Sequence, residues 1–336
     1  MKVAEALCKT PWKRIVRMAA LAVLCLAIGF PALAAYAADD FSVTLLGTGT
    51  PAPSPERFGM STLVEAGGQR LLFDMGRGVT IRLWQKLVPF GSIDAHFLTH
   101  LHSDHVNGLP DLWLTGWIQT PYGGRKKPFT IYGPAGTQKL MAGLWEAFSE
   151  DRRIRTEDEH FPLAGIQTDA HDVKPGVVYE KDGVVVTAFE VDHGDHIKPA
   201  YGYKVSYRGH SVVLSGDTRY HANVERAARG ADLLIHEVAM IPEKLLAEVP
   251  AYKAVYEHHI TPEQAGKLFA LTRPKLAVYS HLVLSGFPKM GIKPPTPEEL
   301  LAATRKTYDG PVVVGADLIG FKIDDTGVSI INPPGK

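Results

Sequence analysis

The stretch His100-Leu101-His102-Ser103-Asp104-His105 places three histidines and one aspartate within six residues. It directly follows residues 93–99, whose apolar composition predicts a β-strand that runs straight into His100. Alternate residues of an extended segment point the same way, so we expect His100 and His102 to bind one metal ion together. The strand and the motif together predict a metal site at the end of a sheet.

Asp104 and His105 extend the motif toward a second metal position. If the chain turns into a helix at Ser103, both side chains swing away from the first position. Imidazole nitrogens and carboxylate oxygens are ordinary zinc ligands, and a catalytic zinc keeps one coordination position for water. The alternative is a solvated, histidine-rich surface loop, which the preceding apolar strand and the distant partners described next disfavour.

Three distant residues are candidate ligands for the same site. Each follows a predicted strand: His193 after residues 184–191, Asp217 after residues 211–214 and His281 after residues 275–279. Groups at the carboxyl ends of strands converge at one edge of a sheet, where sites in such folds gather. We therefore expect these three residues to meet the motif at residues 100–105.

The order H-x-H-x-D-H, a lone histidine, S-G-D-T and a late S-H resembles the metallo-β-lactamase superfamily. The resemblance covers essentially the whole chain after residue 37, and it is closer to the ribonuclease Z and zinc-dependent arylsulfatase branch. The other segments that carry it are Leu46-Gly47-Thr48-Gly49, Phe73-Asp74-Met75-Gly76, Gly202-Tyr203-Lys204-Val205, His236-Glu237 and His259-Ile260-Thr261-Pro262-Glu263-Gln264-Ala265.

This resemblance implies an α+β fold, the αββα sandwich, in which two mixed β-sheets pack together and helices cover their outer faces. Strand and helix patterns alternate along the chain without a long polar linker, which agrees with one layered domain. We expect residues 38–336 to form this single metallo-β-lactamase-fold hydrolase domain.

The resemblance also implies two divalent metal ions, which we expect to be zinc, and a division of the ligands between them. The first ion takes His100, His102 and His193. The second takes Asp104, His105 and His281, and Asp217 bridges both. His196 is an alternative to His193, but His193 is preferred because it directly follows a predicted strand.

Three further residues receive roles by the same resemblance. His259 is the expected proton donor to the leaving group, and Glu237 is expected to orient it, because histidines at such sites need a carboxylate partner. Asp104 is counted with them as a catalytic residue as well as a ligand. The family segment carries a serine where this chain has Ile260, which leaves the hydrogen bonding of His259 open. The alternative is a surface helix with ordinary polar residues.

The remaining side chains near these motifs receive structural interpretations. Asp74 follows an apolar strand and is expected to hydrogen-bond a ligand histidine. No spacing connects His196, His210, His221 and His258 with the site, so they are interpreted as polar surface residues.

The first forty residues have the pattern of a targeting segment. Four basic residues (Lys9, Lys13, Arg14, Arg17) precede an uncharged apolar run at 18–30 and an A-x-A site that ends at Ala37. This pattern predicts a signal peptide over residues 1–37 and a periplasmic or secreted protein without stable membrane anchoring after cleavage. The alternative is an uncleaved N-terminal anchor. Cleavage would remove both cysteines of the chain, Cys8 and Cys25, and with them any disulfide or thiolate ligand.

The charge balance bears on the partner. Residues 1–37 contain five of the 36 basic and one of the 36 acidic residues, so the remaining chain has 31 against 35 and a formal charge of −4. This is unlike the basic footprint of a nucleic-acid binder. Ribonuclease Z enzymes commonly carry a basic arm for transfer RNA, in one major type before S-G-D-T, but only eleven residues separate Tyr203 from Ser215. We therefore expect a small anionic ester as substrate and no nucleic acid; a homodimer is compatible with the sequence.

The resemblance to zinc-dependent arylsulfatases favours sulfate-ester hydrolysis by a hydroxide formed between two metal ions. A phosphodiesterase of the ribonuclease Z branch that does not act on transfer RNA is the second hypothesis. A lactonase or β-lactamase activity is the third, and a metal-binding protein without turnover is the fourth. Five aromatic residues are candidates for an apolar substrate pocket, although packing in the core is favoured for each of them: Trp113, Trp117, Tyr122, Trp145 and Phe148.

Overall fold

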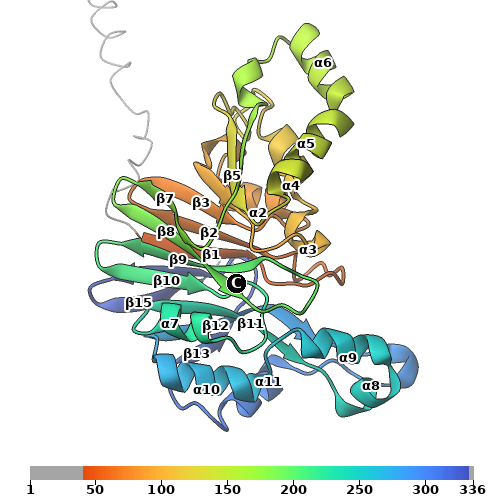
Figure 1. Ribbon diagram of the computed structural model, residues 1–336, viewed down its shortest axis with the longest axis vertical. Helices are drawn as coiled ribbons and strands as arrows, with labels where there is room; N and C mark the ends of the chain where they lie inside the picture. Colours follow the sequence, from red (N-terminus) through yellow and green to blue (C-terminus); the bar gives the residue numbers. More distant parts are fainter. Residues whose placement is uncertain (1–40, 333–336) are drawn as a thin grey trace, which may run out of the picture. The chain divides into compact units, whose positions relative to one another are not determined.

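The computed structural model describes residues 41–332, so the expected signal peptide and its cleavage point lie outside the described residues. Two mixed β-sheets pack face to face, and helices cover their outer faces (Figure 1). This arrangement is the expected αββα sandwich of the metallo-β-lactamase fold, so the predicted fold class is confirmed. Within the part of the chain that is described, no helix has both the length and the apolar character of a membrane span.

The first sheet has eight strands. Their spatial order is β15 (Gly327–Ile331), β14 (Gly320–Asp324), β1 (Phe41–Gly47), β2 (Ser61–Ala66), β3 (Gln69–Phe73), β4 (Ala95–Phe97), β5 (Phe129–Gly133) and β6 (Thr168–Asp172). The strands from β15 to β3 pair antiparallel, whereas β3, β4, β5 and β6 run parallel. The parallel half points the carboxyl ends of β3 and β4 to the same edge, where the histidine motif begins.

The second sheet has seven strands. Their spatial order is β13 (Val312–Val314), β12 (Leu276–Leu284), β11 (Leu233–Met240), β10 (His210–Leu214), β9 (Ala200–Tyr207), β8 (Val184–Val191) and β7 (Gly176–Lys181). β10 to β13 run parallel, and β7 to β10 pair antiparallel. The turn between β9 and β10 contains only Arg208 and Gly209, so no arm projects there.

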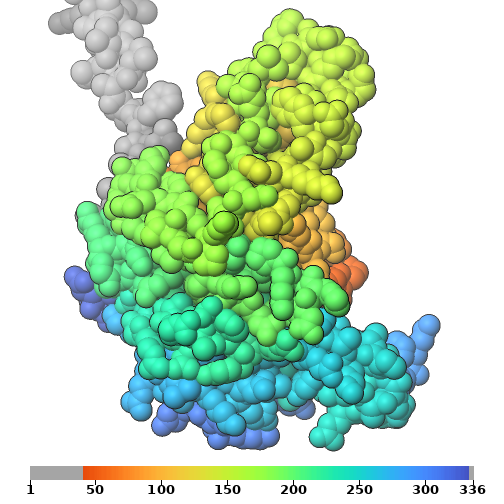
Figure 2. Space-filling model, viewed as in Figure 1, coloured from red at the N-terminus to blue at the C-terminus, as the bar shows by residue number. Residues whose placement is uncertain are grey.

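The helices lie between these strands in the chain. They are α2 (Val79–Gln85), α3 (Ser103–Val106), α4 (Leu109–Thr115), α5 (Thr137–Ala147), α6 (Ser149–Glu157), α7 (Ala222–Ala228), α8 (Glu243–Glu248), α9 (Pro250–Glu257), α10 (Pro262–Thr272) and α11 (Pro297–Thr304), with short 3₁₀ turns at Phe90–Ser92, Leu163–Gly165 and Pro288–Met290. α10 begins with a capping box in which Thr261 and Gln264 satisfy each other's backbone N–H groups. The sequence predicted no helix over residues 243–257, which form α8 and α9 and are coloured teal to cyan in Figure 2.

The main hydrophobic core lies between the two sheets. It takes buried residues from both inner faces, including Phe73, Phe97 and Tyr203, and the Phe73 and Phe97 rings stack with centroids 4.7 Å apart. Burial of aromatic side chains of this size is the largest single contribution that a residue makes to a core. The sheets are therefore held together directly beneath the edge that carries the metal-binding motifs.

A second core fills the space between the first sheet and its helices. Trp113 and Trp117 are fully buried in it, and their indole N–H groups donate to the carbonyls of Ile166 (3.0 Å) and Pro162 (2.8 Å). Both tryptophans are therefore core residues, which confirms the packing that the sequence favoured over a substrate pocket. The charged stretch at residues 150–160 forms most of α6, which buries no residue and projects from the sheets (Figure 1).

His96 is a buried histidine on β4 that takes no part in the metal site. Its Nδ1–H donates to the Thr130 carbonyl at 2.9 Å, and its ring stacks on Phe129 with centroids 3.7 Å apart. Its Nε2 atom is buried without a partner. Burial, assisted by the charges of Arg125 and Lys127, lowers the pKa of His96 to about 3 despite the bond to Thr130. His96 therefore stays neutral in the folded protein.

We predict that His96→Phe makes the fold less sensitive to acid. Because the folded pKa of His96 lies below its ordinary value of 6.5, the unfolded chain alone binds this proton as the pH falls from 6.5 toward 3, and stability is lost. Between pH 7.5 and pH 5 this linkage lowers the free energy of unfolding of the wild-type protein by about 2 kcal/mol, and the variant does not show this loss. Urea unfolding at both pH values measures the two losses, and equal losses would contradict the prediction.

Candidate metal centre

The candidate ligands come from strand ends of both sheets. From the first sheet, the chain leaves β4 at Phe97 and reaches α3 at Ser103, so His100 and His102 lie on the connection and Asp104 and His105 lie on the helix. From the second sheet come His193 after β8, Asp217 after β10 and His281 within β12. The seven residues proposed from the sequence therefore meet at one edge of the sandwich.

Two local backbone features bring the second-sheet residues into position. Gly216 has a φ of 62°, and a Cβ atom there would lie 2.4 Å from the Tyr201 carbonyl oxygen, so only glycine fits before Asp217. His281 has a φ of 45°. The expected end of its strand at Tyr279 is wrong, because β12 continues through His281 to Leu284. Pairing with β11 supports this continuation, and a register shift in the ladder near Val238 accommodates it.

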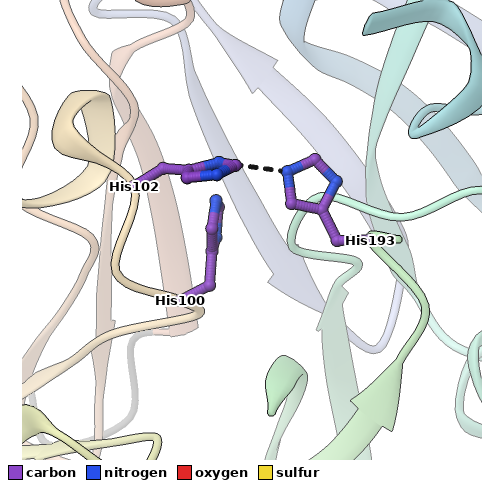
Figure 3. Close-up of side chains that lie close together, drawn as sticks. All are labelled: His100, His102 and His193. Carbon is purple, nitrogen blue, oxygen red and sulfur yellow. Dashed lines mark hydrogen bonds between the residues drawn. The ribbon is translucent and has the colours of Figure 1, made fainter. Parts of the chain in front are cut away.

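His100, His102 and His193 form the first group. Their side chains point toward one another (Figure 3), and one ligand atom from each lies within 4.8 Å of the others. The Nε2 atom of His193 and the Nδ1 atom of His102 are 3.2 Å apart. His100 and His193 are buried, whereas His102 is exposed at the entrance. The expected alternative to His193, His196, is exposed and belongs to none of the groups found among the described residues.

Asp104, His105 and His281 form the second group, and all three are buried. The Asp104 Oδ2 atom lies 3.1 Å from His281 Nε2 and 3.6 Å from His105 Nε2. These separations bring one carboxylate oxygen and two imidazole nitrogens around a common point. The group has the composition expected for the second metal position.

Asp217 lies between the two groups. Its Oδ2 atom is 3.3 Å from Nε2 of both His105 and His281, which belong to the second group. The same oxygen is 3.7 Å from His193 Nε2 and 3.9 Å from His100 Nε2, which belong to the first. One carboxylate therefore faces both groups, as a bridging ligand must.

The hydrogen bonds of the imidazole rings agree with metal ligation. His105 Nδ1–H donates to Asp74 Oδ2 at 2.8 Å, and His100 Nδ1–H donates to Thr99 Oγ1 at 3.0 Å. Thr99 in turn donates from its backbone N–H and its hydroxyl to Asp74. The Nε2 atoms of His100 and His105 are buried without a hydrogen-bond partner and face only the carboxylates of the cluster. Such orphaned nitrogens, with the opposite ring nitrogen fixed by a donor bond, fit a divalent ion.

The electrostatics of the cluster point the same way. Burial lowers the pKa of His193 to about 4 and that of His100 well below its usual range, so both are neutral, as metal ligands are. Burial alone would raise the pKa of Asp217, but His281 and His105 hold it well below its ordinary value. Asp217 and Asp74 raise the pKa of His105 despite its burial. A divalent cation held by these residues would supply the positive charge that a proton on His105 otherwise provides.

His259 and Glu237 form a buried pair beside the cluster. Glu237 Oε2 accepts from His259 Nδ1 at 2.9 Å, and Glu237 Oε1 accepts from the Ile260 backbone N–H at 2.9 Å. Burial lowers the pKa of His259, but the Glu237 carboxylate raises it to about 9. The His259 ring lies 5.0 Å from that of His193 and 5.6 Å from that of His281, between centroids. Neither residue lies on a surface helix.

The structure also resolves the open question at Ile260. Its side chain is fully buried in the core between the second sheet and its helices, and its backbone N–H reaches Glu237. The hydrogen bonding of His259 therefore does not need a side-chain hydroxyl at residue 260. An apolar residue at this position anchors the segment instead.

Two participants escaped the sequence analysis. Thr99 connects Asp74 with His100, and only its position directly before the motif could have indicated this. His258 was interpreted as a surface residue, but it is half-buried and its carbonyl accepts from His193 Nδ1 at 3.1 Å. Because this contact uses the backbone, no side-chain pattern could reveal it.

A cavity of about 280 Å³ opens above the cluster. Its floor contains ligand residues from both groups, together with His259, and its walls come from the loop after β1, from α9 and from the end of β12. Among the described residues, no lysine or arginine lines it. A substrate that enters therefore meets the candidate ligands and His259 directly, without a cationic side chain in between.

Comparison with known proteins gives the family. Residues 41–254 match the family model described as anti-Pycsar protein Apyc1. A ribonuclease Z of Mycolicibacterium paratuberculosis is 36% identical over 284 residues, which cover 84% of this chain and 98% of that protein. A ribonuclease Z of Mycobacterium bovis is 33% identical over 278 residues, which cover 82% of this chain and 96% of that protein.

Solved structures with lower identity share the fold. Human tRNase Z, short form, has a TM-score of 0.60 at 24% identity and covers 87% of this chain and 99% of its own. The metallo-β-lactamase fold protein YhfI from Bacillus subtilis has a TM-score of 0.63 at 19% identity and covers 84% of this chain and 99% of its own. This fold and the histidine–aspartate cluster together imply a hydrolase that uses divalent metal ions.

These matches correct two expectations. The relatives are named ribonuclease Z, so the expected sulfate-ester hydrolysis is wrong. The expectation of a small anionic ester as substrate and no nucleic acid as partner is wrong for the same reason. Net charge was misleading because it averages over the whole surface and does not describe the charge at one site. The missing arm concerns only one insertion site, in one type of ribonuclease Z, and its absence does not indicate which bond is cleaved.

We predict that Asp217→Ala lowers the metal content of both positions. Asp217 is the one described side chain whose oxygen faces both groups, so its removal weakens each of them. Elemental analysis of zinc-loaded protein is expected to give about two ions per chain in the wild type and a clear loss in the variant. His196→Ala, which removes an exposed histidine from the loop that carries His193, serves as the control. Wild-type metal content in Asp217→Ala would exclude a bridging role.

Proposed function

The chain belongs to the metallo-β-lactamase superfamily, to its ribonuclease Z branch and to the family described as anti-Pycsar protein Apyc1, and from this membership we propose that it hydrolyses phosphodiester bonds of RNA with two zinc ions. The observation that carries the proposal is the position of Asp217 between two ligand groups, next to the buried His259–Glu237 pair. Ribonuclease Z relatives that match 84% of this chain over 98% of their own length support the choice of phosphodiester over the other esters.

The ligand set suits zinc at both positions. His100, His102 and His193 would hold the first ion, and Asp104, His105 and His281 the second, with Asp217 shared. Imidazole and carboxylate ligands in this mixture favour zinc among the common divalent ions. Bound divalent ions would supply Lewis-acid polarisation of a phosphoryl oxygen and a hydroxide nucleophile at neutral pH.

The chain's own residues orient this chemistry. Asp74 and Thr99 fix the rings of His105 and His100 through Nδ1, so that each Nε2 faces inward. The His258 carbonyl fixes the ring of His193 in the same way. Rigid donor bonds of this kind keep ligand rings from rotating and raise their basicity. The phosphate charge must be balanced at the ligand cluster, because no lysine or arginine among the described residues lines the cavity.

His259 serves the leaving group in this proposal. Glu237 binds Nδ1 and stabilises the protonated ring, so Nε2–H remains as a donor. When water adds to phosphorus and the ester P–O bond breaks, His259 transfers this proton to the departing oxygen. General acid catalysis at such a position contributes about 10²–10⁴-fold to the rate.

The substrate class is tested with the purified, zinc-loaded protein and three substrates: an oligoribonucleotide, bis(p-nitrophenyl) phosphate and p-nitrophenyl sulfate. We expect cleavage of both phosphodiesters, no cleavage of the sulfate, and loss of all activity after chelation. A chelator-treated sample that regains activity with zinc is the control for damage by the chelator. Hydrolysis of neither phosphodiester by fully loaded protein would refute the proposal.

We predict that the cost of His259→Ala depends on the leaving group. A nitrophenolate departs without a proton, whereas the alkoxide of a nucleoside needs one. The variant should therefore lose little activity on bis(p-nitrophenyl) phosphate and about 10²-fold or more on an oligoribonucleotide. Glu237→Gln should show the same pattern more weakly. Equal losses on both substrates, with metal content intact, would instead mean that His259 positions the substrate.

We also propose that residues 1–37 direct export and are removed, so that the enzyme acts on RNA in the periplasm or outside the cell. The motive is the basic, apolar and A-x-A pattern of this segment. Amino-terminal sequencing of the exported protein is expected to begin near Ala38. Retention of Met1 in a membrane fraction would favour an anchor over a cleaved signal.

A further inference from the structure

Helix α9 forms a wall of the substrate cavity that the metal chemistry does not use. The cavity that contains His259 and His281 continues to Tyr252 and Val255 of α9 and to Val283 near the end of β12. The ligand atoms thus occupy one part of the cavity, and α9 faces the part next to His259. Because His259 is the proposed donor to the leaving oxygen, a group attached to that oxygen would lie on this side of the cavity.

The chemistry of this wall is apolar and aromatic. Besides Tyr252 and Val255, its side chains include Pro51, Ala52 and Val283. Val255 is 38% exposed, so its side chain is accessible to a ligand that enters the cavity. With no lysine or arginine from the described residues in the lining, the wall is unsuited to grip a series of phosphates. It suits a flat, weakly polar ring.

Tyr252 is held in place for such a contact. Its hydroxyl donates to the Gly286 carbonyl at 3.3 Å, in the loop that follows β12. Its ring is half-buried against a small cluster around Leu245 and Ile241, which carries α8 and α9. A ring fixed at both ends loses little conformational entropy when a ligand stacks on it. The exposed part of the ring therefore forms a preorganised surface within the cavity.

We propose that Tyr252, with Val255 beside it, is the platform on which the nucleobase next to the scissile phosphate stacks. The proposal rests on the phosphodiesterase function and names the nucleotide that this site selects. The cavity of about 280 Å³ is at the lower end for small-molecule sites, so one nucleotide fills it and the rest of the RNA remains outside. The base contact, rather than contacts with backbone phosphates, provides the grip on the substrate.

The test measures binding, so that it does not depend on turnover. The zinc-loaded protein is titrated with adenosine 3′- and 5′-monophosphates and with the ribose phosphates that lack the base. In the wild type, we expect at least one nucleotide to bind about tenfold more tightly than its base-free counterpart. Tyr252→Leu should bind the two equally, while Tyr252→Phe, which keeps the ring, should retain the preference.

Tyr256→Leu provides the matched control, because it removes an aromatic ring from the same helix that does not line the cavity. It should retain the preference for the base. The same comparison is then made in kcat/KM with dinucleotides that carry a base or an abasic sugar on either side of the phosphate. Tyr252→Leu should remove the dependence on one of the two bases and leave the dependence on the other.

The outcomes separate this inference from the proposed function. If phosphodiesters are cleaved but Tyr252→Leu leaves every base preference unchanged, the platform is wrong and the phosphodiesterase stands. If no phosphodiester is cleaved but the base preference depends on Tyr252, the platform stands and the proposed reaction fails. Loss of the preference in Tyr256→Leu as well would mean that helix α9 acts only through its packing, and would overturn the role of Tyr252.

Discussion

The contact of the Asp217 carboxylate with imidazoles of both sheets is the interaction on which the rest of this structure depends. Oδ2 of this residue lies 3.3 Å from His105 Nε2, which the first sheet supplies, and 3.3 Å from His281 Nε2, which the second supplies. A buried carboxylate costs several kcal/mol unless opposite charge surrounds it. The two sheets must therefore meet in one relative position. The Tyr203 ring of the second sheet packs against Phe73 and Phe97 of the first, with centroids 5.4 and 5.7 Å apart, and helps to maintain it.

Hydrogen bonds around that contact fix the orientation of the imidazole rings in the cluster. Asp74, at the end of β3, accepts directly from His105 Nδ1–H and reaches His100 through the Thr99 hydroxyl. Glu237 acts in the same manner on β11, where it binds both His259 and the backbone of Ile260. In each case a carboxylate from a strand orients an imidazole from a neighbouring segment, so ring orientation follows from sheet geometry and does not depend on flexible loops.

The floor and the wall of the cavity have different roles: the floor provides the reaction chemistry, and the wall on α9 provides the substrate specificity that we propose. The floor consists of the ligand cluster and His259, whose chemistry suits any phosphodiester and does not by itself select one. The wall of α9 belongs to a segment that packs on its own small hydrophobic cluster, apart from the core between the sheets. Such a segment can change without disturbing the metal ligands. Specificity therefore resides where the packing is local, and reactivity resides where both sheets meet.

The sequence by itself determined the seven residues that meet at the sheet edge, because closely spaced ligands after apolar strands are a local pattern. The fold class and the His259–Glu237 pair followed from the resemblance of its motifs to the superfamily. Tertiary structure alone decided what depends on residues far apart in the chain. It continued β12 through His281, brought the His258 carbonyl to His193 and set Tyr252 above the site. None of these features has a periodic signal in the sequence, because each depends on which surfaces remain open after the two sheets have packed together. The substrate class was misjudged from the sequence for the same reason: net charge is a property of the whole chain, and chemistry is a property of one cavity.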